Sequence, residues 1–156
     1  MEKRTAGILL YRRKAKVLEV LLVHPGGPFW AHKDDGAWSI PKGLYGAEEE
    51  PLAAATREFA EETGGTFAGT PHPLGTFRQP SGKVLSAWSV EGDFDPKKLV
   101  SSTCMVEWPP HSGKQMEIPE VDRGAWLTVD KATVKIHLGQ KPVLRALLAH
   151  LGESGS

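Results

Sequence analysis

Apolar residues near the start of the chain fall in short, nearly continuous runs. Residues 5–11 (TAGILLY) and 17–23 (VLEVLLV) are rich in strand-favouring side chains, and the charged segment RRKAK separates them. Further strand-like runs follow between Gly-, Pro- and Asp-rich turns, namely AWSI, PLGTFR, KVLSAWSV, TCMVEW and GAWLTV. We therefore predict an early pair of strands and a series of hairpin-like strands after it.

Two segments carry the 3.6-residue apolar period of helices. The first runs from about Pro51 to Thr63, since proline suits a first helical position and Gly64-Gly65 suits a C-terminal stop. The stripe expected to face its core is Leu52, Ala55, Thr56, Phe59 and Thr63. The closing segment PVLRALLAHL repeats apolar residues in the same way. Together these elements predict an α/β fold with a mixed sheet flanked by helices, and they leave its topology open.

Length, composition and charge narrow the class of protein. The chain has 156 residues, 40% hydrophobic and 24% charged, so we expect a single domain over residues 1–151 and a disordered tail over 152–156. Its 19 basic and 19 acidic residues balance, which argues against a nucleic-acid or membrane partner. The single cysteine, Cys104, and the lack of a signal-peptide core predict a cytoplasmic protein, either monomer or homodimer.

The segment REFAEETGG, residues 57–65, places three glutamates close together on the first predicted helix. Glu58, Glu61 and Glu62 are related by spacings of three and four, and Arg57 can pair with Glu61. They lie in the C-terminal half of the helix, where the helix dipole disfavours negative charge. Two interpretations follow: a solvated acidic face, or a site for a hard cation such as Mg²⁺, which prefers carboxylate oxygens.

The residues around this helix decide between the two interpretations. Residues 43–65 read GLYGAEEEPLAAATREFAEETGG, and this segment resembles the Nudix box, G-x5-E-x7-R-E-U-x-E-E-x-G-U, where U is a bulky apolar residue. The positions in register are Gly43, Glu49, Arg57, Glu58, Phe59, Glu61, Glu62 and Gly64. The last position departs, because it is Gly65, and weaker packing of the loop on the next strand is expected there. The chain is thereby identified as a member of the Nudix family.

The resemblance implies an α/β/α sandwich in which the box forms a loop-helix-loop that holds Mg²⁺ or Mn²⁺. It assigns the metal ligands to the carbonyl of Gly43 and to the side chains of Glu58, Glu61 and Glu62. It also implies that Arg57 and Glu49 orient those carboxylates.

In several Nudix relatives another glutamate, just before a tryptophan-containing strand, completes the site or acts as base. Glu120, six residues before Trp126, fits that position, and Glu117 is its competitor. The implied chemistry is Mg²⁺-dependent hydrolysis of a diphosphate linkage, in which a glutamate accepts the proton of the attacking water. The sequence does not choose between Glu58 and Glu120 for that role.

Substrate residues are less clearly marked. WSIPKG before the box resembles the entry of Nudix branches that cut diadenosine polyphosphates and diphosphoinositols, and Lys42 within it is a candidate phosphate ligand. Phe29 and Trp30 are candidates to stack on a base, with packing on the core as the alternative. Trp88, Trp108 and Trp126 are expected in the core. The predicted substrate is a small nucleotide, a dinucleoside polyphosphate or nucleoside triphosphate. The alternatives are ADP-ribose, a nucleotide sugar, or a catalytically silent nucleotide-binding domain.

Overall fold

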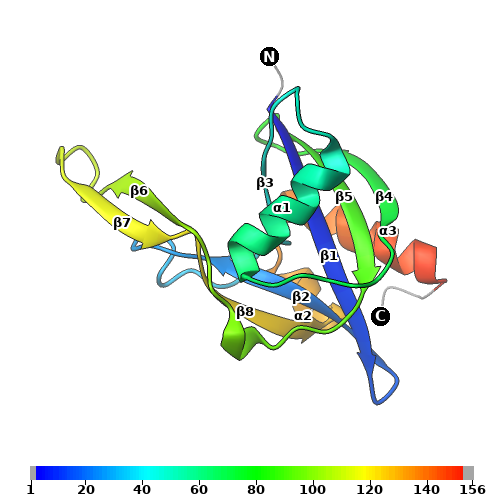
Figure 1. Ribbon diagram of the computed structural model, residues 1–156. Coiled ribbons are helices and arrows are strands. Elements are labelled where there is room, and N and C mark those ends of the chain that lie inside the picture. The colour runs from blue at the N-terminus through cyan, green and yellow to red at the C-terminus, as the bar shows by residue number, and fades with distance from the viewer. Residues whose placement is uncertain (1–2, 153–156) are drawn as a thin grey trace.

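A mixed β-sheet with helices on both faces forms the body of the protein, seen in a computed structural model that describes residues 3–152 (Figure 1). The strands are β1 (Arg4–Lys14), β2 (Val17–Pro25), β3 (Lys42–Leu44), β4 (His72–Arg78), β5 (Val84–Glu91), β6 (Thr103–Glu107), β7 (Gln115–Pro119) and β8 (Val121–Thr128). The helices are α1 (Pro51–Thr63), α2 (Val129–Lys135) and α3 (Lys141–Leu151), with short 3₁₀ turns η1 (Pro96–Lys98) and η2 (Leu138–Gln140). Of the predicted disordered tail only Gly152 is described, and residues 153–156 lie outside the described part.

Strand β1 is the strand around which the sheet is assembled. It pairs in parallel with β5, and its other edge is shared by two antiparallel partners. Residues 5–7 pair with β3, whereas residues 11–14 pair with β2. The main path of the sheet runs β4-β5-β1-β2-β8. Sharing one edge in this way brings the short strand β3, which carries Gly43, beside helix α1.

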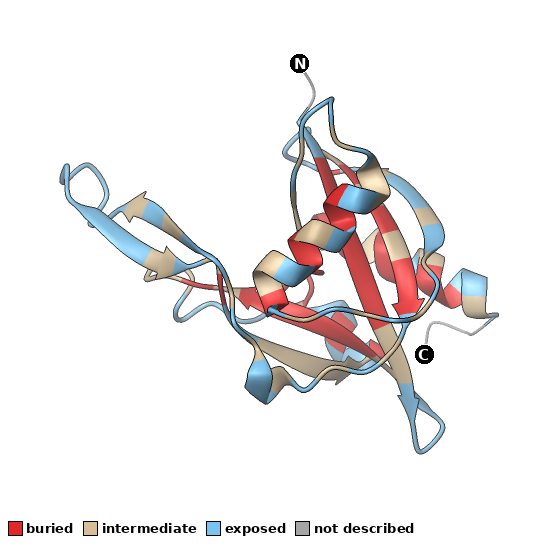
Figure 2. Ribbon diagram, in the orientation of Figure 1, coloured by how far each residue is buried: buried red, intermediate tan, exposed pale blue. Residues whose placement is uncertain are grey.

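The two faces of the sheet are both buried (Figure 2). Side chains of successive residues point to opposite faces, so Ile8 and Leu10 pack in the cluster with α1, whereas Leu9 packs in the cluster with α2 and α3. This explains why the central strands read as continuous apolar runs rather than as alternating ones. The α/β/α sandwich expected from the sequence is confirmed.

Helix α1 begins and ends where the sequence predicts. The Glu50 side chain accepts a hydrogen bond from the Ala53 amide at 3.0 Å, Pro51 occupies the first turn, and Gly64 ends the helix with φ 77°. One position of the predicted core stripe is wrong. Thr56 is exposed, and its hydroxyl donates to the Leu52 carbonyl at 2.9 Å.

Three further expectations for the strands are corrected. The segment AWSI forms only two isolated bridges, because the Ile40 amide donates to the Gln140 side chain and not to a neighbouring strand. The charged segment RRKAK is not a loop as a whole, because its first three residues continue β1 to Lys14. Only Ala15 and Lys16 form the turn to β2. The hairpin β6–β7 stands apart from the main sheet, and its second strand was not predicted. Among the helices within residues 3–152, none combines the length and apolar character that crossing a bilayer requires.

Candidate metal site and adjoining cleft

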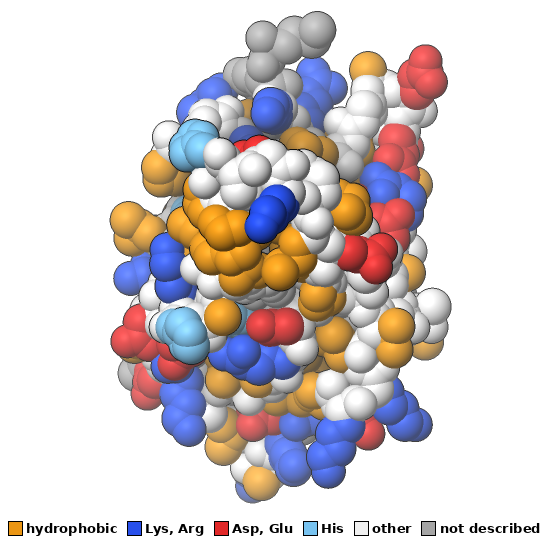
Figure 3. All heavy atoms as spheres, turned by 90° about the vertical axis from the view of Figure 1, so that its left-hand side faces the viewer, with side chains coloured by type: hydrophobic (Ala, Val, Ile, Leu, Met, Phe, Trp, Pro, Cys, Tyr) orange, Lys and Arg blue, Asp and Glu red, His pale blue; other side chains and the backbone are white. Residues whose placement is uncertain are grey.

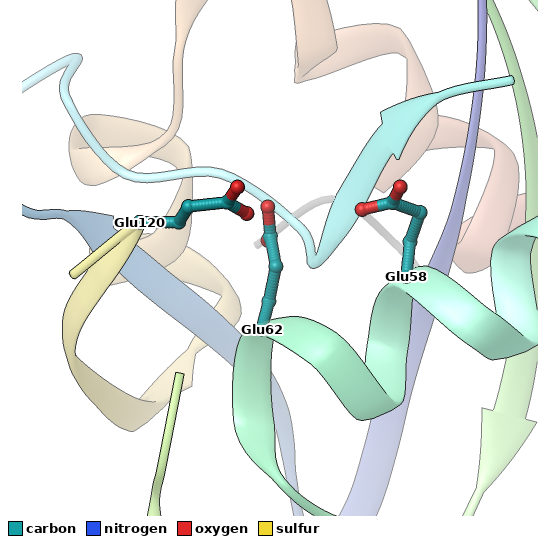
Figure 4. A group of neighbouring side chains, drawn as sticks. All are labelled: Glu58, Glu62 and Glu120. Atoms are coloured by element: carbon teal, nitrogen blue, oxygen red, sulfur yellow. The ribbon is translucent and has the colours of Figure 1, made fainter. Parts of the chain in front are cut away.

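Three carboxylates from two separate elements meet at one end of helix α1 (Figure 4). Glu58 and Glu62 lie one helical turn apart on α1, and Glu120 lies at the junction of β7 and β8. One carboxylate oxygen from each lies within 4.8 Å of the other two. Three converging carboxylates are a donor set that suits Mg²⁺ or Mn²⁺. The fit of these residues to a hard divalent ion is therefore good.

Gly43 is required at this site by the position of Glu58. A Cβ atom at residue 43 would lie 2.0 to 2.4 Å from the carboxylate atoms of Glu58. Glu58 is only 6% exposed and rests directly against the backbone of β3. A residue with a side chain at position 43 would displace this carboxylate.

Arg57 connects the glutamates of the helix to the loop before it. Its guanidinium donates two parallel hydrogen bonds to the carboxylate of Glu49, both at 2.8 Å. It also donates to Glu58 at 2.8 Å and to Glu61 at 3.1 Å. These hydrogen bonds raise the pKa of Arg57, and those to Glu49 have the largest effect. In turn, Arg57 lowers the pKa of the Glu49 carboxyl. Arg57 thus fixes the direction of the Glu58 side chain.

Glu61 is not one of the three converging carboxylates, and its charge helps to raise the pKa values of Glu58 and Glu120. Both of its oxygens accept from Arg57, and it is not a member of the group formed by Glu58, Glu62 and Glu120. The structure therefore brings together three of the four glutamates named from the sequence and pairs the fourth with the arginine.

Burial disfavours the ionised form of the three carboxylates when no cation is bound. It raises the pKa of Glu62 to about 8, and it raises the pKa values of Glu58 and Glu120. Repulsion from neighbouring carboxylates adds to the shift in each case. Such shifts are typical of sites that bind a cation or transfer a proton.

Lys42 lies beside this group on β3. Its backbone amide donates to Glu62 at 3.2 Å, and burial lowers the pKa of its ammonium group. Together with Glu62 and Glu120 it lines a small hollow of about 130 Å³. Lys42 is the one Lys or Arg among the described residues that line this hollow.

Glu120 and its competitor Glu117 have different surroundings. The backbone of Glu120 is fixed on both sides, since its carbonyl accepts from Gly26 at 3.1 Å and its amide donates to Ser102 at 2.8 Å. Glu117 lies within β7 and is exposed, and its carboxylate accepts from the Thr103 hydroxyl at 3.2 Å. Only Glu120 faces the glutamates of α1.

A cleft of about 550 Å³ opens from the carboxylates between the loop after β2 and the hairpin β6–β7. We call it the aromatic cleft. Its lining residues are Pro25, Gly26, Gly27, Pro28, Phe29, Trp30, Glu62, Cys104, Val106, Glu107, Trp108, Pro110, Ile118 and Glu120. Figure 3 views the molecule from the hairpin side and shows hydrophobic side chains gathered at the centre of this face. Phe29 and Trp30 both line this cleft, and Trp30 also packs against the core cluster on the α2 and α3 side of the sheet, as the alternative expectation had it.

Two glycines allow the loop to approach the hairpin. A Cβ atom at Gly26 would lie 2.2 Å from the Pro119 carbonyl oxygen, and one at Gly27 would lie 2.6 Å from the Ile118 side chain. His24, fully buried at the end of β2, holds the far part of the same loop. Its Nε2 atom donates to the Lys33 carbonyl at 2.6 Å, and its Nδ1 atom contacts Asp122 at 2.9 Å. The sequence offered no spacing signal that would have identified His24.

The expectation that three tryptophans pack in the core is wrong for one of them. Trp88 and Trp126 are partly buried against the cluster beneath α1. Trp108 belongs to none of the core clusters formed by the described residues and lines the aromatic cleft. The error has a simple cause, because TCMVEW reads as a strand of the main sheet, whereas the hairpin leaves that sheet.

The departure of the box at Gly65 is compensated by another residue. A Cβ atom at Gly65 would lie 2.7 Å from the ring of Phe94, which packs with the cluster beneath α1. Phe94 also makes an edge contact with Phe59, with 6.4 Å between ring centroids. An aromatic ring from the loop after β5 thus occupies the space that a bulky residue at position 65 would fill.

The comparisons with known proteins agree with this architecture. The family model of the NUDIX domain matches residues 1–147, so the chain belongs to the Nudix family. A comparison with curated proteins gives no match.

Solved structures with this fold include a Caenorhabditis elegans Ap4A hydrolase complex, at 24% identity and a TM-score of 0.65, covering 96% of this chain and 98% of that one. The NUDIX domain of Shewanella oneidensis NrtR complexed with ADP ribose is similar at 17% identity and a TM-score of 0.69, covering 97% and 89%. A mutT/nudix family protein from Listeria innocua is similar at 17% identity and a TM-score of 0.64, covering 96% and 94%. At these identities the likeness establishes the fold alone.

Proposed function

We propose that this protein is a divalent-metal-dependent hydrolase that cleaves a diphosphate linkage in a nucleotide. The observation that carries the proposal is the convergence of Glu58, Glu62 and Glu120 within 4.8 Å at the mouth of an aromatic cleft. These carboxylates would hold the ion, with the carbonyl of Gly43 as a further expected ligand. When bound, the ion supplies positive charge that offsets the charge of the diphosphate and increases the acidity of a water molecule.

The protein's own residues divide the remaining work. Water attacks one phosphorus of the linkage, and the bond from that phosphorus to the bridging oxygen breaks. We assign the proton of this water to a carboxylate oxygen of Glu120, whose side chain has no hydrogen-bond partner among residues 3–152. Glu58 is less suited, because it already accepts from Arg57 at 2.8 Å. Lys42 would approach the negatively charged phosphate groups as a point charge.

Dinucleoside polyphosphates and nucleoside triphosphates are the substrates that the WSIPKG entry favours. ADP-ribose is a second candidate, and a specific observation favours it. The lining of the aromatic cleft, as far as the structure describes the chain, contains Glu62, Glu107 and Glu120 but no Lys or Arg. A short diphosphate that keeps its charge near the metal site suits such a cleft better than a long polyphosphate does.

The test is a substrate panel incubated with Mg²⁺, with products separated by chromatography. The panel contains diadenosine tetraphosphate, nucleoside triphosphates, ADP-ribose, a nucleotide sugar and coenzyme A. We expect Mg²⁺-dependent products from at least one nucleotide, and loss of these products in Glu62→Gln. Nucleotide binding by calorimetry without any product would instead identify a silent nucleotide-binding domain. Turnover that persists in Glu62→Gln would contradict the assigned site.

A further inference from the structure

The hairpin β6–β7 carries an apolar face that packs in none of the core clusters of the described residues. Cys104 pairs with Ile118 and Val106 with Met116 in the hairpin register, so these side chains share one face. None of them belongs to the core clusters of residues 3–152. Cys104, Val106 and Ile118 line the aromatic cleft instead. This face of the hairpin is therefore a wall of the cleft rather than part of the core.

The tip of the hairpin is built to hold Trp108 in place. Both oxygens of the Glu107 carboxylate accept backbone amides of the tip, from His111 at 3.0 Å and from Gly113 at 3.1 Å. The Trp108 amide donates to the Lys114 carbonyl at 3.0 Å. The Glu107 carboxylate is thus held in place by its own loop. Trp108 lines the cleft together with Phe29 and Trp30 of the opposite loop.

The charge of the lining identifies the part of a substrate that fits. The charged side chains of the lining are all acidic, so an anionic group is repelled there except where a metal ion offsets Glu62 and Glu120. Lys33 lies outside the lining, and its ammonium is 3.7 Å from the Phe29 ring centroid and 5.2 Å from that of Trp30, so these two rings already have a cation over them. Three aromatic rings line the remainder. An uncharged planar group has favourable contacts there, and stacking on an aromatic ring does not depend strongly on which base is stacked.

We propose that the aromatic cleft takes the nucleobase of the substrate, with Trp108 on the hairpin as the residue that stacks on it. This inference rests on the proposed function and specifies where the uncharged end of the nucleotide lies. The lining side chains offer few groups that hydrogen-bond to a base edge. An apolar pocket discriminates weakly between ligands that differ in polar substituents. The site accordingly accepts adenine, guanine and uracil with similar affinity.

Binding is measured with α,β-methylene nucleoside diphosphates, which lack the cleavable bridging oxygen, in the presence of Mg²⁺. Trp108→Ala is expected to raise the Kd of the adenosine analogue about tenfold, or about 1.4 kcal/mol, and Trp108→Phe to restore most of the affinity. Met105→Ala is the matched control. It lies on the same hairpin, is 58% exposed and does not line the cleft, so its Kd should be unchanged. Thermal melting of each variant checks that the fold is intact.

A second readout reports the position of the ligand without activity. Cys104 is the only cysteine of the chain, so the rate of its alkylation by iodoacetamide, followed by mass spectrometry, reports on the cleft alone. Burial, together with the charge of Glu120, raises the pKa of the Cys104 thiol, so the ion by itself can change the rate. Mg²⁺ without nucleotide is therefore the reference. The analogue is expected to slow alkylation at least tenfold below that reference.

Both results are required. An analogue that binds wild-type protein with Mg²⁺ but leaves either the Cys104 rate or the Kd of Trp108→Ala unchanged overturns the inference and leaves the proposed hydrolase intact. A difference above about tenfold among the adenosine, guanosine and uridine analogues overturns the expected tolerance for the base. Failure of all analogues to bind overturns the inference, and the substrate panel then decides the proposed function separately.

Discussion

Replacing Glu62 with glutamine tests whether repulsion among the three carboxylates lowers the stability of the metal-free protein and whether a bound metal ion removes that loss. Burial, with repulsion from Glu58 and Glu120, raises the pKa of Glu62 from 4.5 to about 8. The folded metal-free protein therefore binds this proton more tightly than the unfolded chain does. The stabilisation from the bound proton is complete below pH 4.5 and is lost as the pH rises through about 8. Glutamine has a similar shape and does not titrate, so the stability of Glu62→Gln should not fall in this way as the pH rises.

The magnitude follows from the shift. A change in the pKa of Glu62 from 4.5 to about 8 corresponds to a loss of stability with rising pH of at most roughly 5 kcal/mol. Attraction to Lys42 and relaxation around the site reduce it, and we expect about 1–3 kcal/mol. For a chain of this size that is a difference in Tm of roughly 2–12 °C. Glutamine can still accept the hydrogen bond that the Lys42 amide donates at 3.2 Å, so this contact is preserved in the variant.

The assay is thermal unfolding of wild type and Glu62→Gln in a metal chelator, at pH 5 and at pH 9. The variant should match wild type at pH 5 and exceed its Tm at pH 9. Saturating Mg²⁺ at pH 9 should raise the Tm of wild type by linkage and that of the variant much less. Glu117→Gln is the control, because this carboxylate is exposed on β7 and is not a member of the cluster. Equal Tm differences at both pH values would refute the assignment of stored repulsion to Glu62.

Three other predictions concern the same site. Glu120→Gln should lower kcat/KM on any substrate that the panel identifies by at least ~100-fold, about 2.7 kcal/mol of transition-state stabilisation. Glu117→Gln should change kcat/KM less than about threefold, and equal losses in the two variants would contradict the choice of Glu120 over Glu117. Arg57→Lys should weaken Mg²⁺ binding by roughly 10–100-fold in calorimetric titrations, because lysine cannot reproduce the paired bonds to the loop, and wild-type affinity would count against an orienting role. Gly43→Ala should weaken Mg²⁺ binding at least tenfold, because its Cβ atom would lie 2.0 to 2.4 Å from the Glu58 carboxylate atoms; unchanged affinity would show that Glu58 relocates freely.

The parts of the fold and the site that depend on local sequence could be predicted. Pro51 and Gly64 set the bounds of α1, and the spacing of its glutamates placed Glu58 and Glu62 on one side of the helix. The position of Glu61 was harder to predict. It differs from Glu62 by one residue, or about 100° around the helix, and that rotation directs it to Arg57, so it is not a member of the converging group.

Features that depend on how distant segments meet could not be predicted in the same way. Trp108 reads as part of a strand, and only the separation of the hairpin from the main sheet turns it toward the cleft. His24 carries no spacing signal, because its partners Lys33 and Asp122 are 9 and 98 residues away along the chain. Phe94 fills the space over Gly65, and this exchange between loops 29 residues apart leaves no pattern in either segment.

Glu120 connects the metal site to the cleft. Its backbone is hydrogen-bonded to Gly26, on the loop that carries Phe29 and Trp30, and to Ser102, which directly precedes the hairpin. Its side chain meets Glu58 and Glu62. A ligand that draws the loop and the hairpin together over a base therefore acts on the two segments that hold Glu120. Because the two groups of contacts share this junction, changes in the cleft wall should affect metal affinity more than equally exposed changes elsewhere on the hairpin, such as at Met105.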